Sequence, residues 1–279
     1  ASFIVTIPEN FERDIVRGER PALLVAVDAS DPATSGAAAS ALSKLAQNSI
    51  NALATGPLAF LAGKPDAFSV VAHKRYNPAG KTSYNIVPGL LAIIISMTMV
   101  MITAIAIVRE TERGTMETLL ATPARAPEVM LGKIIPYVLI GYVQTCVFFI
   151  LAFLVFNVPF VGPVAPFLIG LNIFILVNLA LGFLFSTVAK NQMQAMQMSF
   201  FYMLPSILLS GFMFPFAGMP AWAQIIGLLI PSTHFMRIIR KIMLKGADLW
   251  DIVPDLRAMI LILVGITLLA MLRYKRTLD

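Results

Sequence analysis

The sequence predicts an α-helical integral membrane protein, with about five membrane spans, a re-entrant or interfacial helical segment and a small extracytoplasmic α/β domain at the N-terminus. Of its 279 residues, 58% are hydrophobic and 13% are charged, whereas about 25% of residues are charged in soluble domains. No Asp, Glu, Lys or Arg occurs in residues 134–189 or 191–236. Residues 1–85, in contrast, have a mixed and polar composition with charges of both signs.

The first 85 residues alternate between strand-like and helix-like segments. Apolar, β-branched runs predict strands at residues 3–7, 21–28 and 67–76. Pro8 and Gly18 mark the ends of a short helix over 8–18, and an Ala-rich run predicts a second helix over 30–54. This order indicates a small sheet covered on one side. Because the chain begins with Ala1 in strand-like sequence, we expect it to be a fragment that lacks its natural N-terminal portion.

The remainder, residues 86–279, reads as a transmembrane domain. A helix needs about 20 apolar residues to cross a bilayer. Five runs qualify as spans, at residues 86–108, 134–156, 165–187, 193–215 and 254–272. Residues 217–250 contain two prolines, two tryptophans and four basic residues, which favours broken helices at the membrane interface over a further span.

Lysine and arginine predict the orientation of these spans. The segments 109–133, 188–192 and 273–279 would lie on one side of the membrane, and they carry eight basic residues. The positive-inside rule makes that side cytoplasmic, and places residues 1–85 outside and the C-terminus inside. The net charge of +6 is therefore explained by topology and anionic lipid rather than by nucleic acid. The four basic residues in 217–250 count against this orientation.

The loop over 109–133 carries helix signals of its own. Gly114 breaks the preceding span, Thr115 can cap a new helix, and Glu117 would lie in its first turn. One face of that helix would carry Met116, Leu119 and Leu120. The residues leave two readings open: an amphipathic helix lying in the lipid headgroups, or a helix that docks a cytoplasmic partner.

Several motifs resemble one family, and they do so in order along the chain. They are YNPAGKTSYNIVPGLLA (76–92), ETERGTMETLLATPARAPEVMLGKIIPYVLIGYVQ (110–144), MLPSILLSGFMFPFAGMPAWAQ (203–224), PSTHFMRIIRKIMLKG (231–246) and RYKRTLD (273–279). Together they look like an ABC-2 type transporter permease, the membrane subunit of one group of ATP-driven exporters. The family has a further span before its external domain, which agrees with the fragment interpretation.

The resemblance implies a mechanism and a set of partners. The loop after this span would contact a separate ATPase subunit, and the matching residues are Arg109, Glu110, Glu112, Arg113, Gly114, Thr115, Met116, Glu117 and Leu120. ATP and magnesium would be bound by that ATPase, and this chain would bind no cofactor or metal. The permease would work in the bacterial inner membrane with a second copy or a homologous permease, and a periplasmic adaptor is a further expected partner. The expected activity is export of a hydrophobic or amphipathic substrate, as in multidrug efflux.

The substrate path has two sets of candidate residues. Glycines and prolines in 211–220 suggest an outer gate, with Gly211, Phe212, Phe214 and Pro215 as its candidates, although a simple helix end explains them equally well. Gln144 and Asn178, like Thr145 and Asn172, would either join helices or touch substrate. Six methionines in 193–219 are read as lipid-facing or packing residues, with a substrate lining as the alternative.

Other classes of protein fit less well. An ion-coupled secondary transporter usually holds ionisable residues at mid-membrane, and the two charge-free runs argue against one. An intramembrane enzyme would need a nucleophile with a base, or paired acids with a metal, and we find no such catalytic set. His73 and His234 have no evident carboxylate or cysteine partner, and His234 is expected to make a local hydrogen bond near the bilayer surface. A receptor or scaffold without an ATPase partner remains open.

Overall fold

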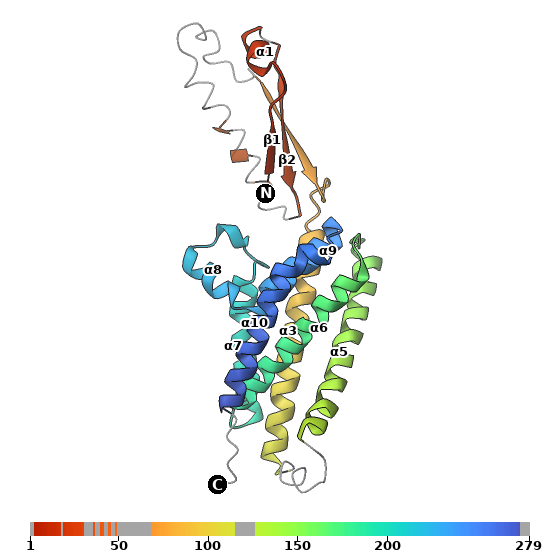
Figure 1. The fold of residues 1–279 in the computed structure, drawn as a ribbon, viewed down its shortest axis with the longest axis vertical. Coiled ribbons are helices and arrows are strands. Elements are labelled where there is room, and N and C mark those ends of the chain that lie inside the picture. Colours follow the sequence, from red (N-terminus) through yellow and green to blue (C-terminus); the bar gives the residue numbers. More distant parts are fainter. Residues whose placement is uncertain are drawn as a thin grey trace. The chain divides into compact units, whose positions relative to one another are not determined.

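The computed structural model describes residues 3–17, 19–30, 36, 40–41, 44–45, 48, 68–114 and 126–273. It divides into two compact units, residues 1–85 and 86–279 (Figure 1). The first unit is built around a small sheet, and the second consists of helices.

The sheet of the first unit has three strands in the order β1-β2-β3. These are β1 (Phe3–Thr6), β2 (Ala22–Asp28) and β3 (Ser69–Arg75), and helix α1 (Phe11–Arg17) connects the first two. β1 pairs antiparallel with β2, and β2 pairs parallel with β3. The three predicted strands and the first helix are confirmed. Most of the helix predicted over 30–54 lies outside the described residues.

Four helices of the described chain are long and apolar enough to cross a membrane. They are α3 (Ser83–Glu112), α5 (Ala126–Leu154, counted from Ile134), α6 (Val164–Ser186) and α10 (Leu249–Arg273). Four of the five predicted spans are thereby confirmed. The shortest, α5 counted from Ile134, has 21 residues, which at about 1.5 Å per residue just exceeds the roughly 30 Å of a bilayer core.

The fifth predicted span, residues 193–215, is wrong at its C-terminal end, and its helix is more polar than the other four. Helix α7 covers Gln192–Leu209, 18 residues, and is not among the four span-length apolar helices. Three glutamines, at positions 192, 194 and 197, lower the apolarity of its first turns. The helix ends before Gly211, whose φ of +83° is left-handed and breaks the helical path.

The segment 217–250 contains no span, as predicted, but it is less superficial than expected. It forms a short 3₁₀ turn, η2 (Phe216–Gly218), and two helices, α8 (Ala221–Leu228) and α9 (Pro231–Lys245). Eleven of the 15 residues of α9 are buried. The helix packs against α6 and α10, because its apolar residues recur on one face while its basic residues lie on the other.

Helix α6 lies at the centre of this packing. It contacts α10, α9, α5 and α7, and the rings of Phe174 on α6 and Phe235 on α9 stack with centroids 4.2 Å apart. In the most apolar 18-residue stretch of each helix, 56% of the residues are buried in α3 and in α6, compared with 17% in α5 and 22% in α10. The first two helices are therefore inner helices, and α5 and α10 present apolar surface outward.

Candidate functional site

The charged end of α3 holds the first residues of the predicted coupling segment. Arg109, Glu110 and Glu112 form the last turn of α3, followed by Arg113 and Gly114. Gly114 has a φ of +68°, a left-handed conformation that only glycine adopts without strain. The predicted break after the span is therefore present at Gly114.

The rest of the predicted coupling segment lies outside the described residues. This applies to Thr115, Met116, Glu117 and Leu120, and to the amphipathic helix that they were expected to form. Their role in coupling stays a prediction.

Glu112 joins α3 to the beginning of α7. One carboxylate oxygen of Glu112 accepts a hydrogen bond from the backbone N–H of Gln192 at 3.0 Å, and the other accepts one from the Gln192 side-chain amide. The first backbone N–H groups of a helix have no partner within the helix, and a negative charge there is favoured by the helix dipole. Asn191 completes the cap by accepting from the Gln194 N–H at 2.8 Å. Glu112 thus acts as part of the N-terminal cap of a helix 80 residues away.

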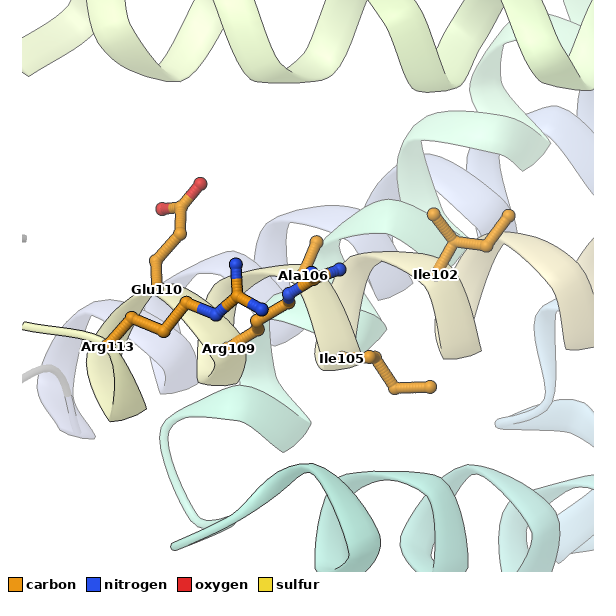
Figure 2. Close-up of a pocket in the computed structure, with 6 residues that line it drawn as sticks. All are labelled: Ile102, Ile105, Ala106, Arg109, Glu110 and Arg113. Carbon is orange, nitrogen blue, oxygen red and sulfur yellow. The ribbon is translucent and has the colours of Figure 1, made fainter. Parts of the chain in front are cut away.

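A pocket runs along another side of α3. Its described lining consists of Ile102, Ile105, Ala106, Arg109, Glu110 and Arg113. These positions recur every three or four residues, so they form one stripe on a single helix. Figure 2 shows the stripe, with the side chains of Arg109 and Arg113 running back along α3 toward Ala106. We call this set the α3 stripe.

The predicted outer gate is held by contacts with α3 and α9. The Phe212 ring packs so closely on Gly89 that a Cβ added at Gly89 would come within 2.4 Å of it. Both terminal nitrogens of Arg240 donate to the Gly211 carbonyl at 3.3 Å. Arg237 lies 4.5 Å from the centroid of the Phe216 ring, a cation–π distance. Phe214 is 54% exposed, and Pro215 precedes the 3₁₀ turn.

The two polar candidates within the spans both join helices. Asn178 is fully buried, accepts a 2.6 Å hydrogen bond from the Ser96 hydroxyl on α3 and donates to the Phe174 carbonyl. Gln144 on α5 donates to Thr98 on α3 at 3.0 Å. Both residues thus link α3 to a neighbouring helix. A contact of either with substrate stays a prediction.

A cluster of charges between α9 and α10 was missed by the sequence analysis. Asp255 on α10 is 6% exposed, and its carboxylate lies 2.8 Å from Lys241 Nζ and 3.9 Å from Arg237 Nη1. His234 Nδ1 lies 3.4 Å from the same carboxylate, and its Nε2 lies 2.9 Å from the Leu228 carbonyl. The expectation that His234 lacks a carboxylate partner is therefore wrong, because α10 brings in a residue 21 positions away. Its expected local hydrogen bond is present.

This arrangement is typical of helix packing in a membrane protein. The described residues contain no group of three or more His, Cys, Asp or Glu side chains placed to hold a metal ion. Asp255 is surrounded by cations that compensate its charge, and its polar neighbours serve to hold helices together. Span-length apolar helices together with a buried α9, and a charged segment at one end, define a multi-pass membrane protein.

The comparison with known proteins identifies the family. The chain belongs to the ABC-2 family transporter proteins, whose model matches residues 1–272. Three relatives from Escherichia coli K12 are similar to it. "Probable multidrug ABC transporter permease YbhR" is 30% identical over 253 residues, covering 91% of this chain and 67% of the relative. "Probable multidrug ABC transporter permease YbhS" is 33% identical over 205 residues, or 73% and 54% of the two chains. "Inner membrane transport permease YhhJ" is 28% identical over 283 residues, or 99% and 73%.

The family assignment confirms the resemblance drawn from the five motifs. The chain is therefore a transporter permease and a multi-pass membrane protein. It spans about two thirds of YbhR and about half of YbhS.

Proposed function

We propose that this chain is the permease subunit of an ATP-driven exporter, and that residues 109–120 receive movement from a separate ATPase subunit that binds ATP and magnesium. The family supplies the general scheme. The local support is the concentration of charge at the end of α3, where two apolar spans would otherwise need only a short connector.

One observation carries this proposal. Glu112 caps α7 with both carboxylate oxygens, so a force applied just after α3 acts on two helices that are distant in sequence. The turns of α3 that precede its last turn pack on the same region, where Ala104 and Val108 form a buried cluster with Ala195 of α7. A protein that pushes on residues 109–120 would therefore move α3 and α7 together.

The proposed orientation follows from the distribution of basic residues. The ends of α3, α6 and α10 and the beginnings of α5 and α7 lie at the same end of the helical unit (Figure 1). The segments that follow or join them carry most of the basic residues outside 1–85, so we place this end in the cytoplasm and residues 1–85 in the periplasm of a bacterial inner membrane. Two permease copies, or this chain with a homologous permease, would complete the transporter, and a periplasmic adaptor is a further expected partner.

The proposed substrate is a hydrophobic or amphipathic molecule. Residues 134–189 and 191–236 lack charge, and two of the relatives carry "multidrug" in their names. Exposed Met193, Met196 and Met213 could adapt to varied apolar shapes. The test is uptake of a fluorescent amphipathic cation into inverted vesicles that contain the full transporter. Transport of a small hydrophilic solute in strict preference to the dye would overturn this assignment of substrate.

The coupling role is tested by ATP hydrolysis in the reconstituted complex of permease and ATPase. Glu117→Arg reverses a charge in the coupling segment, and Glu112→Leu removes the cap on α7. Glu19→Arg, an exposed charge reversal in the first unit, is the control. We expect the first two variants to fold and insert but to lose most of the stimulation of ATP hydrolysis by the permease. Full stimulation in Glu117→Arg would refute the role given to residues 109–120.

A further inference from the structure

We propose that the α3 stripe is a binding site for one anionic phospholipid, with the phosphate at Arg109 and Arg113 and an acyl chain along Ile102 and Ala106. This inference depends only on the chain spanning a membrane. It shares Arg109 and Arg113 with the proposed coupling segment, but its test measures lipid contact without an ATPase.

The chemistry of the stripe changes along its length. At one end it is apolar, and at the other it carries two arginines and one glutamate. Ala106 lies in the middle, where its small side chain leaves room beside the helix. A groove that is apolar at one end and cationic at the other matches a lipid with a negative headgroup.

The dimensions of the stripe also match one leaflet. Ile102 and Arg113 are eleven residues apart, which is about 16 Å along an α-helix. Half of a bilayer core is about 15 Å thick. With the arginines at the headgroup level, Ile102 would therefore lie deep in the same leaflet, beside the middle or end of an acyl chain.

The two arginines are suited to share one phosphate. They are four residues apart, so they are neighbours on the helix surface. Within the described part of the chain, neither guanidinium forms a hydrogen bond or ion pair with another side chain, and Arg113 interacts with Glu112 only through the attraction of their charges. Each guanidinium is a strong bidentate donor to phosphate. Figure 2 shows both side chains directed back along α3, which brings their charges toward the apolar part of the stripe. Glu110 opposes one of the two positive charges and has an interaction of its own, so the stripe retains a net charge of +1 from its own residues.

The site can be tested with brominated lipids, which quench tryptophan fluorescence on contact. The full chain would carry Ile102→Trp as its reporter, with its two natural tryptophans replaced as Trp222→Phe and Trp250→Phe. It would be reconstituted into phosphatidylcholine vesicles that contain either phosphatidylglycerol or phosphatidylcholine brominated midway along the acyl chains. We expect phosphatidylglycerol to associate at least about five-fold more strongly, since one basic residue near a membrane surface contributes about that factor.

Three variants of the reporter protein locate the preference. Arg109→Gln with Arg113→Gln should bring the two lipids to near equality. The Lys pair at the same positions should retain much of the preference, which excludes misfolding of α3 as the cause. Arg273→Gln, which removes one exposed charge at the end of α10, should leave the ratio within about two-fold, because Arg273 does not line the stripe.

Three results would overturn the proposal. Equal quenching by the two lipids in the reporter protein would show that the stripe does not select an anionic headgroup. Absence of quenching by either lipid would show that protein, rather than lipid, covers the stripe. A preference that survives the double Gln substitution would equally remove the arginines from the site.

Discussion

The Asp255 cluster makes a quantitative prediction about the junction of α9 and α10. Asp255→Asn removes the negative charge that faces Lys241 at 2.8 Å and Arg237 at 3.9 Å. Loss of one partner from a fully buried ion pair costs about 3–5 kcal/mol. The side chains of the two cations are 33% and 37% exposed, however, while that of Asp255 is 8% exposed. Partial solvation of the cations reduces the expected loss of unfolding free energy to about 2 kcal/mol.

The assay is thermal unfolding of the purified protein in mild detergent, followed by size-exclusion chromatography. A loss of about 2 kcal/mol corresponds to a fall in Tm of about 4–8 °C for a unit of this size. Asp251→Asn is the matched control, because Asp251 is an exposed residue one turn earlier in α10 whose carboxylate accepts only from the Asp248 N–H at 3.2 Å. We expect its effect on Tm to be less than half as large.

A double-mutant cycle separates the ion pair from general damage to the junction. Lys241→Met removes the cation while keeping a long apolar stem. If the pair is coupled, the double variant should be more stable than the sum of the single effects predicts, by about 1 kcal/mol or more. Effects of the two single substitutions that add within about 0.5 kcal/mol would refute this account of the cluster.

Two further predictions concern the contacts of α6 with α3. Gly182→Ala should lower the free energy of unfolding by about 2 kcal/mol in the same assay, because the added Cβ would lie 2.6 Å from the Val100 carbonyl oxygen. Gly265→Ala is the control: a Cβ there would meet no atom within 4 Å, so the substitution should be neutral or stabilising. Asn178→Leu should lower the free energy of unfolding by about 1 kcal/mol, because the buried hydrogen bond from the Ser96 hydroxyl is lost. The double variant with Ser96→Ala should lose no more stability than either single variant. Additive losses would contradict that pairing.

The parts of the fold that the sequence predicted depend on local signals. The strands at 3–6, 22–28 and 69–75 follow from short β-branched runs, and four spans follow from apolar length alone. The end of the fifth span was misplaced because a window of apolar residues was extended across Ser210 and Gly211, where the left-handed φ of Gly211 stops the helix. Apolarity continues through this region while helical geometry does not.

The candidate site was less predictable, because its contacts join residues distant in sequence. Asp255 lay inside a segment identified as a span, and its pairing with α9 depends on how α9 and α10 pack. The sequence did contain one signal for this pairing. It was a carboxylate near the start of an apolar helix, close in sequence to four basic residues on an amphipathic segment. Glu112 was noted for its charge, but nothing local indicates that it caps a helix beginning 80 residues later.

If residues 109–120 couple the permease to an ATPase, the contacts of Glu112 and Arg240 connect one end of the helical unit to the predicted gate. Glu112 holds the beginning of α7, and the other end of α7 leads directly to Gly211, which Arg240 holds through its carbonyl. An 18-residue helix spans about 27 Å, so α7 reaches from Glu112 to the segment of the predicted gate, with Pro205 interrupting its backbone hydrogen bonds about one turn before its end. Arg240 belongs to α9, which is fixed to α10 by Asp255. A movement of α7 must therefore either carry α9 with it or break the contact between Arg240 and Gly211, and the second outcome would release the segment that holds Phe212 against α3.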